Sequence, residues 1–482
     1  MVQPAKPRPS SAAILIRDTH PIQVYLAKRG RNQLFYPGFH SFLGGSIQKE
    51  DWEIGKTFAP EMDEELKAEM VALLREIFEE TGLLLVTPFP DPKRLYLERK
   101  GLLEGKLSLK HILEKLHVQP DPSYWIPLGR KTTPPLFPIR YQTRFFLAKV
   151  PPEADIEIWP GELESGAWFT REEALRQWEN REILIPPPVV ILLQLMDGAL
   201  DSPEQIEKLR YLDDENLEKE VLLIPFDPLC QLLPLKTDTV PPATHTNCYF
   251  IGRKRFYILD PAPSDPKEQE FLLKGIQKRI SQGDRPVAIL LTHYHRDHVG
   301  AALKASQAFE IPIYGHPKTE EMILAKGDKG IPGFRIHRYL KGGEILSEVD
   351  MGKMEVHFTP GHSPDHLAYY FPEESLLFCG DLVSTLSSIL VPPKPKGSLA
   401  EYMKSLHHIA KLEYQWLLPS HGPPTTLGKE TVLQFIEHRQ QRENQFLKAL
   451  AEKERTKEEL LQIIYGREVP EKMLDFAAYN VP

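Results

Sequence analysis

The chain has few cysteines and no long apolar segment. Its three cysteines, Cys230, Cys248 and Cys379, are far apart and form no CxxC motif. This spacing argues against a disulfide framework and against a cysteine-ligated zinc site. No apolar run approaches the roughly 18 to 20 residues that cross a bilayer, and the N-terminus lacks the apolar centre of a secretory signal. We therefore expect a cytoplasmic protein without a membrane partner.

An excess of positive charge is also absent. The 482 residues carry a formal net charge of −8, which provides no electrostatic footprint for broad nucleic-acid binding and leaves room only for a local basic groove. We find no internal repeat and no low-complexity tract. The length and the hydrophobic content of 41% predict a globular protein of about two to three domains.

Histidines and acids, by contrast, are concentrated in residues 292–298. This stretch contains His293, His295, Asp297 and His298. It directly follows the apolar run 287–291, which is typical of a buried strand. Imidazole and carboxylate side chains at the end of a strand suit zinc, iron or manganese. One loop cannot complete such a site, so further ligands are expected downstream.

Three later segments supply candidates, each where a strand-like run ends. They are His362, Asp381 and His421. The order His-x-His-x-Asp-His, His, Asp, His resembles the metallo-beta-lactamase superfamily. The resemblance implies an αββα sandwich that holds two Zn²⁺ ions, or iron or manganese.

By this resemblance, the candidate ligands of the first metal are His293, His295 and His362. The candidate ligands of the second are Asp297, His298 and His421, and Asp381 would bridge the two. A metal-bound hydroxide would attack a carbonyl or phosphorus centre, with Asp297 also a candidate catalytic residue. Asp260, at the end of an earlier strand-like run, would orient a ligand histidine.

Residues 246–249, 359–366 and 420–424 resemble the beta-lactamase-like protein 2 group within that superfamily. Helical patterns at 435–443 and 456–461 are similar to the winged-helix-like tail of this group, whose characterised members include a single-stranded RNA endonuclease. RNA is therefore an alternative partner. We interpret His438, Arg439 and Arg442 as a solvated helix face rather than as phosphate contacts. Homodimerisation through this domain is possible by resemblance only.

A second group of acids lies in residues 70–82, a helical pattern that ends on Gly82. Glu76, Glu79 and Glu80 are spaced i, i+3 and i+4, so they share one helix face. Three carboxylates on one face repel one another unless a cation lies between them, and Mg²⁺ or Mn²⁺ prefers such oxygen ligands.

Residues 75–83 match the second half of the Nudix box, REUxEExGU. The resemblance implies a Nudix α/β/α fold and diphosphate hydrolysis. Glu79 and Glu80 would be metal ligands, Glu76 a ligand or the general base, and the carbonyl of Gly45 a further ligand. Arg75 would hold a carboxylate in orientation.

The first half of the box is split. Arg75 lies 30 positions after Gly45, which is longer than the usual pattern. Asp51 takes the place of the first glutamate when the count starts at Gly45, whereas Lys67 takes it when the count runs back from Arg75. Such a split resembles the peroxisomal coenzyme A diphosphatase branch of the Nudix hydrolases. We interpret Glu162, in a later stretch that also resembles this branch, as a surface residue.

These observations predict an α/β multidomain protein: a Nudix domain at 1–200, a solvated linker helix at 201–220, a metallo-beta-lactamase-like domain at 221–425 and a helical tail at 426–482. The favoured function is a bifunctional metallohydrolase that acts on coenzyme A, acyl-coenzyme A or a related small-molecule nucleotide, and on a thioester or phosphodiester. One alternative is RNA processing, with a 5′-end Nudix pyrophosphohydrolase and an endoribonuclease. In the non-enzymatic alternative, one domain is only a nucleotide-binding scaffold.

Overall fold

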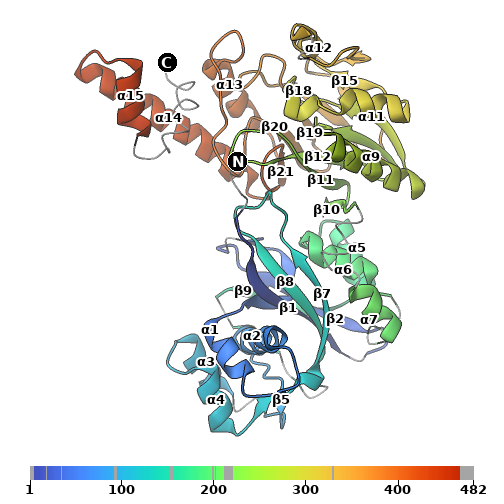
Figure 1. Cartoon of the computed structure of the whole chain (residues 1–482), viewed down its shortest axis with the longest axis vertical. Coiled ribbons are helices and arrows are strands. Elements are labelled where there is room, and N and C mark those ends of the chain that lie inside the picture. Colours follow the sequence, from blue (N-terminus) through green and yellow to red (C-terminus); the bar gives the residue numbers. More distant parts are fainter. Residues whose placement is uncertain are drawn as a thin grey trace.

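Figure 1 presents the computed structural model of the chain, whose two lobes follow one another along the sequence. The structure describes residues 5–466 except 18, 34, 92–94, 152–153, 155, 160, 198–199, 201, 211–220 and 328–329. Among these residues, no helix is long and apolar enough to cross a bilayer.

The first lobe is built on a mixed seven-stranded sheet. Strand order is β3-β2-β1-β8-β7, β4 also pairs with β1, and β9 pairs with β2. Only the β1–β8 pair is parallel. The strands are β1 (Arg8–Arg17), β2 (Gln23–Arg29), β3 (His40–Ser41), β4 (Leu43–Ser46), β7 (Trp125–Thr132), β8 (Tyr141–Lys149) and β9 (Leu163–Thr170).

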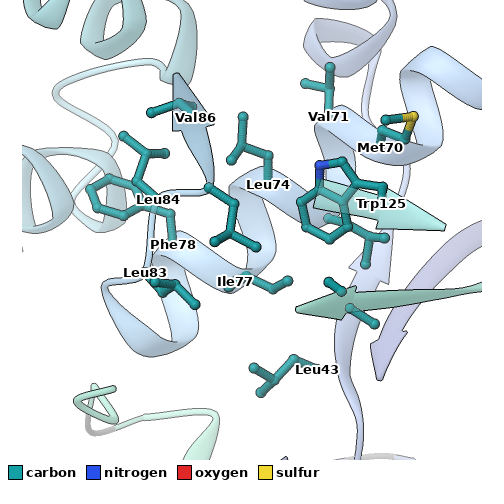
Figure 2. Packing of buried hydrophobic residues seen from close by; sticks show 14 of the residues in the cluster. Leu43, Met70, Val71, Leu74, Ile77, Phe78, Leu83, Leu84, Val86 and Trp125 are labelled. Carbon is teal, nitrogen blue, oxygen red and sulfur yellow. The ribbon is translucent and has the colours of Figure 1, made fainter. Parts of the chain in front are cut away.

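Helices cover both faces of this sheet, and alternate side chains of its central strand are buried on the two faces. Ala13 and Leu15 of β1 belong to one apolar cluster, and Ile14 and Ile16 belong to the other, as expected when successive side chains point to opposite faces. The first cluster is filled by α2 (Glu64–Thr81), whose Leu74, Ile77 and Phe78 pack near Trp125 and Leu43 (Figure 2). The second is filled by α5 (Arg171–Glu179), α6 (Pro187–Leu195) and α7 (Pro203–Arg210).

Smaller elements complete this lobe beside α2 (Figure 1). They are α1 (Lys49–Gly55), β5 (Val86–Thr87), α3 (Tyr96–Leu103), α4 (Leu109–Leu116) and β6 (Gln119–Pro120).

Helix α7 differs from the solvated linker helix expected at 201–220. Ser202 caps it, because the N–H of Gln205 donates to its Oγ at 3.2 Å. However, Leu209 is fully buried in the same cluster as Trp178 and Val190. This part of the predicted linker therefore packs on the first lobe, and residues 211–220 lie outside the described residues.

The second lobe consists of two sheets with helices outside both, which confirms the expected αββα sandwich. The seven-stranded sheet runs in chain order: β10 (Ile224–Asp227), β11 (Cys230–Lys236), β12 (His245–Ile251), β13 (Arg255–Leu259), β14 (Arg285–Leu290), β15 (Ile313–Gly315) and β16 (Arg338–Tyr339). The five-stranded sheet also runs in chain order: β17 (Ile345–Leu346), β18 (Met354–Phe358), β19 (Leu367–Phe371), β20 (Leu376–Gly380) and β21 (Trp416–Pro419).

The helices of this lobe bury one apolar layer against each sheet. On the first sheet lie α9 (Pro266–Ser281), α11 (Ala302–Phe309) and α12 (Pro317–Leu324). On the second lie α13 (Leu399–Ile409) and the first half of α14 (Gly428–Glu452). The second half of α14 pairs with α15 (Lys457–Tyr465) in a separate small cluster, and this hairpin projects from the lobe in Figure 1.

The two lobes share apolar packing. Phe39 of the first lobe lies edge-on to Trp416 of β21 at a centroid separation of 5.8 Å. Phe137 stacks on Phe226 of β10 at 6.4 Å. These side chains belong to the cluster that fills the space between the two sheets of the second lobe, so the core of the second lobe continues into the interface.

Arg181 adds a charged contact across the interface, and its removal is expected to be strongly destabilising. Its Nε and Nη2 both donate to Asp227 at 2.8 Å, whose side chain is only 1% exposed. The Arg181→Ala variant leaves a buried carboxylate without its cation, which should cost about 3 kcal/mol in the free energy of unfolding measured with urea. The control is Arg176→Ala, whose ion pair with Glu182 has side chains 58% and 49% exposed and should change stability by about 0.5 kcal/mol or less. Equal losses of unfolding free energy in the two variants would show that the Arg181–Asp227 pair contributes no more than an exposed ion pair.

Candidate metal centre and a second acidic site

The histidine and aspartate side chains predicted as ligands meet at one edge of the sandwich. Residues 292–298, which run into the short helix α10 (Arg296–Val299), follow β14. His362 lies between β18 and β19, Asp381 directly follows β20, and His421 follows β21. Three overlapping groups have ligand atoms within 4.8 Å of one another: His293, His295 and His362; His293, His298 and Asp381; Asp297, His298 and His421.

Asp381 lies between the two sets of ligands. Its Oδ2 is 3.5 Å from Nε2 of His362 and 3.6 Å from Nε2 of His298, and its Oδ1 is 3.5 Å from Nε2 of His421. Nδ1 of His295 is 2.9 Å from Nε2 of His362. This is the arrangement required if Asp381 is to touch two neighbouring cations, as the resemblance implies.

The protein directs the imidazole nitrogens toward the centre. His362 and His421 donate Nδ1–H to the carbonyls of Leu390 and His245, at 2.6 Å and 3.0 Å. Because a carbonyl only accepts, Nε2 of each ring keeps its lone pair for the centre. The sequence pattern did not reveal these two carbonyl partners, since backbone acceptors leave no signature.

Asp260 was predicted to orient a ligand histidine, and the structure places it in that position. Its Oδ2 lies 2.8 Å from Nδ1 of His298. Its two oxygens also accept from the backbone N–H and the hydroxyl of Thr292, at 2.8 Å and 2.7 Å. Asp260 is fully buried, so these contacts hold the carboxylate in one orientation.

His366 positions Asp381, a role that sequence reasoning did not assign. Its Nε2 accepts the backbone N–H of Asp381 at 3.0 Å, and its Nδ1 is 2.9 Å from the hydroxyl of Thr359. Burial and the neighbouring imidazole of His362 lower the pKa of His366 to about 3, so the ring is neutral and able to accept. His366 lies within residues 359–366, which supported the resemblance to the beta-lactamase-like protein 2 group. Their sequence did not indicate the contact with Asp381.

The electrostatics of the centre fit divalent cations. Burial and neighbouring histidines lower the pKa of His293 and His295 well below the usual range, so both rings are neutral donors of lone pairs. Although burial opposes it, the neighbouring histidines His421 and His298 hold the pKa of Asp381 well below its usual range. Nε2 of His298 and Oδ1 of Asp381 are buried without a hydrogen-bond partner among the described residues. A cation supplies the partner that such buried atoms require.

The centre lies in a cleft of about 480 Å³. Besides the ligands, its lining includes Val240, Arg296, Ile389, Leu390 and Tyr465. The cleft therefore combines the metal ligands with apolar side chains that suit an acyl chain.

The helical tail forms part of this cleft, which corrects the expected solvated face of α14. Arg439 is buried, donates to the carbonyl of Ile389 in the cleft wall, and lies over the ring of Tyr402 at 5.4 Å. Arg442 lies over the ring of Tyr465 at 4.9 Å. His438 alone of the three predicted positions is exposed. Amphipathic periodicity missed Arg439 and Tyr465 because their surroundings come from segments far away in the chain.

The split glutamate motif of the first lobe is brought together by an ion pair. Nε and Nη2 of Arg75 donate to Asp51 of α1 at 3.1 Å and 3.0 Å, and Nη1 donates to Glu76 at 2.8 Å. Asp51 and Arg75 are 0% and 3% exposed. The structure therefore favours Asp51 over Lys67 at the place of the first glutamate of the box.

Glu76, Glu79 and Glu80 form an acidic site on α2. Burial, together with the charges of its acidic neighbours, raises the pKa of Glu79 to about 7 despite the opposing charge of Arg75. Burial and the charge of Glu76 raise the pKa of Glu80 well above its usual range, and Oε2 of Glu80 has no hydrogen-bond partner among the described residues. Glu162 is exposed as expected, but its charge also raises the pKa of these glutamates.

The fit of a cation to this site is looser than at the histidine centre. The glutamates are absent from the groups of described residues whose ligand atoms gather within 4.8 Å. Gly45 faces them so closely that a β-carbon there would lie 2.2 Å from Oε1 of Glu76. An oxygen-preferring cation would still relieve the repulsion and satisfy Glu80. A pocket of about 190 Å³ adjoins the site, with Arg29, Phe35, Tyr36 and Tyr141 in its lining.

An αββα sandwich that gathers histidines and aspartates at one edge defines a metal-binding hydrolase, and the comparisons with known proteins agree. The model of the Metallo-beta-lactamase superfamily matches residues 241–421. The beta-lactamase-like protein 2 homolog of Caenorhabditis elegans is 30% identical over 213 residues, which cover 43% of this chain and 66% of that protein. The atrochrysone carboxyl ACP thioesterase of Aspergillus fumigatus is 30% identical over 254 residues, which cover 48% of this chain and 73% of that protein. The chain therefore belongs to the metallo-beta-lactamase superfamily, and it is a hydrolase.

For the first lobe, one solved structure carries the name that the glutamate motif predicts. The NUDIX hydrolase from Alicyclobacillus acidocaldarius is 26% identical and covers 40% of this chain and 91% of its own, with a TM-score of 0.36. A TM-score of 0.36 does not establish a shared fold, so the Nudix assignment stays a prediction.

Proposed function

We propose that the chain is a bifunctional metallohydrolase with a thioesterase centre in the second lobe and a diphosphatase centre in the first. The observation that carries the first assignment is a pair of buried ligand atoms, Nε2 of His298 and Oδ1 of Asp381, that have no hydrogen-bond partner in the part of the chain that the structure describes. The name of the Aspergillus relative, a thioesterase, favours a thioester over a phosphodiester as the substrate.

In the second lobe, the two ligand sets would hold a pair of divalent cations, zinc or else iron or manganese. When bound, such a pair lowers the pKa of water and stabilises negative charge that develops on the substrate. The protein contributes the orientation of each ligand: Asp260 fixes His298, and the N–H of Asp381 is held by His366. Ile389 and Leu390 would contact the acyl chain and exclude water from it.

In the first lobe, Glu76, Glu79 and Glu80 would hold Mg²⁺ or Mn²⁺, with the carbonyl of Gly45 opposite them. The cation would supply charge neutralisation for a diphosphate. Arg75, fixed by Asp51, keeps Glu76 in place. The aromatic side chains that line the adjoining pocket, Phe35, Tyr36 and Tyr141, suit the base of a coenzyme A-like nucleotide.

Mass spectrometry of products tests both assignments at once. The protein, supplied with Zn²⁺ and Mg²⁺, is incubated with one medium-chain acyl-coenzyme A. Free acid with intact coenzyme A would support the thioesterase, and adenosine 3′,5′-bisphosphate with acyl-phosphopantetheine would support the diphosphatase. If neither appears, the coenzyme A assignment fails for both lobes.

RNA processing remains an alternative prediction. The observed tail counts against it, because Arg439 and Arg442 are engaged in packing at the cleft. The non-enzymatic alternative would require a defective site, whereas every predicted ligand of the second lobe faces the same centre. Homodimerisation also stays a prediction.

A further inference from the structure

Positively charged side chains from separate segments gather beside the metal centre. Arg296 directly follows the candidate ligand His295 and lines the cleft. Lys326, after α12, places its Nζ 4.7 Å from the centre of the Tyr294 ring. Tyr294 itself packs against the ring of His295 at a centroid separation of 4.6 Å. Arg296 is therefore next to His295 in the chain, and Lys326 is separated from His295 by the Tyr294 ring.

Lys396 lies in a third segment, the loop before α13. Ser398 in this loop donates its backbone N–H to the carbonyl of Gly361 at 2.8 Å. Because Gly361 precedes the candidate ligand His362, this hydrogen bond holds the loop beside the centre.

The positive charges of the other two segments act on Lys326. Partial burial and the positive charges of Arg296 and Lys396 lower the pKa of Lys326, although Asp297 and Asp365 act in the opposite direction. A group of like charges beside a cleft raises the local concentration of oppositely charged ligands.

The three basic side chains are not needed to neutralise the carboxylate ligands. Asp297 and Asp381 are the carboxylates in the predicted ligand set, and two divalent cations carry more charge than they do. With metal bound, the centre is already positive before Arg296 and Lys326 are counted. Asp238 is the remaining acid in the lining of the cleft, so the surplus persists and suits an anionic substrate.

We propose that Arg296, Lys326 and Lys396 form an anion-binding rim that selects thioesters bearing a phosphate group. This inference rests on the proposed thioesterase function of the same centre. Three cations match a phosphate dianion better than a single carboxylate. The apolar side chains of the cleft would receive the acyl chain, while the rim would bind the phosphorylated thiol part.

A matched pair of substrates tests the rim: acetyl-4′-phosphopantetheine and acetyl-pantetheine, which differ by one phosphate. Neither contains a diphosphate, so the proposed activity of the first lobe cannot act on them. We expect the zinc-loaded protein to prefer the phosphorylated thioester by about tenfold or more in kcat/KM at low ionic strength, and added salt to reduce the preference.

The decisive variant is Lys326→Gln. It should lower kcat/KM for the phosphorylated thioester at least about fivefold more than for acetyl-pantetheine. Lys304→Gln is the matched control, because it makes the same charge change at an exposed lysine of α11, and it should affect neither substrate. No preference in the wild type, or equal losses on both substrates, would overturn the rim.

Failure of the proposed function is separately visible. If neither thioester is hydrolysed, the thioesterase assignment fails, and the rim is then tested by binding alone. Free 4′-phosphopantetheine should raise the melting temperature of the zinc-loaded wild type more than that of Lys326→Gln. Equal shifts in the two proteins would overturn the rim.

Discussion

Replacing Asp381 with asparagine is expected to lower thioester hydrolysis by about a thousandfold or more, equivalent to roughly 4 kcal/mol in the barrier. Asp381 is the one predicted ligand whose oxygens lie within 3.6 Å of histidines from both sets. Asparagine preserves the shape of the side chain but removes its charge and replaces one lone-pair oxygen with an N–H donor. The variant should therefore bind less metal as well as lose activity.

The measurement combines zinc content after dialysis with kcat/KM for an acyl thioester. Asp350→Asn is the matched control, since Asp350 is an exposed acid of the same lobe that accepts the N–H of Arg255 at 2.8 Å. The control should keep both its zinc and its activity. If Asp381→Asn also retains full zinc content and activity, Asp381 does not bridge the centre.

The ligand set could be predicted because the chemistry depends on local sequence. Each ligand follows an apolar run, and such a run predicts a strand whose end lies at the edge of a sheet. The order of His293, His362, Asp381 and His421 along the chain then indicated a fold whose strand ends converge. Distances among these side chains could not be predicted, because they depend on how the two sheets pack.

The split motif of the first lobe marks where sequence reasoning stopped. Counting from Gly45 and counting back from Arg75 put two different residues, Asp51 and Lys67, at the place of the first glutamate, and periodicity offered no way to choose. Packing of α1 against α2 decides the matter, because it places a fully buried carboxylate beside a buried guanidinium. A buried guanidinium requires a carboxylate partner. No local sequence pattern indicates which acid supplies it.

The cleft wall and the lobe interface were missed for a related reason. Arg439 and Tyr465 lie on helices whose composition indicates a solvated surface, and Phe39 and Phe137 lie in segments that had been assigned to another domain. Their burial comes from contacts with residues distant in the chain. A pattern of polar and apolar residues along one element does not contain that information.

The second large effect is expected from Glu80→Gln in the first lobe. Diphosphate hydrolysis should fall by about a thousandfold or more, while thioester hydrolysis by the other lobe should continue. In the metal-free protein the same change should raise the free energy of unfolding by about 1 to 2 kcal/mol. The reason is that burial and the charge of Glu76 raise the pKa of Glu80 in the folded state. A carboxyl group whose pKa is raised on folding destabilises the folded state above its unfolded pKa, so removing its charge stabilises the protein at neutral pH.

Adding Mg²⁺ should reverse this order of stabilities. A cation that binds only the folded state stabilises it by mass action, so Mg²⁺ should raise the melting temperature of the wild type and have little effect on Glu80→Gln. The matched control is Glu64→Gln, at an exposed position in the first turn of the same helix, which should respond to Mg²⁺ as the wild type does. Equal Mg²⁺ shifts in the wild type and Glu80→Gln would show that Glu80 is not a ligand. Retained diphosphatase activity in that variant would remove the glutamate helix from the catalytic site altogether.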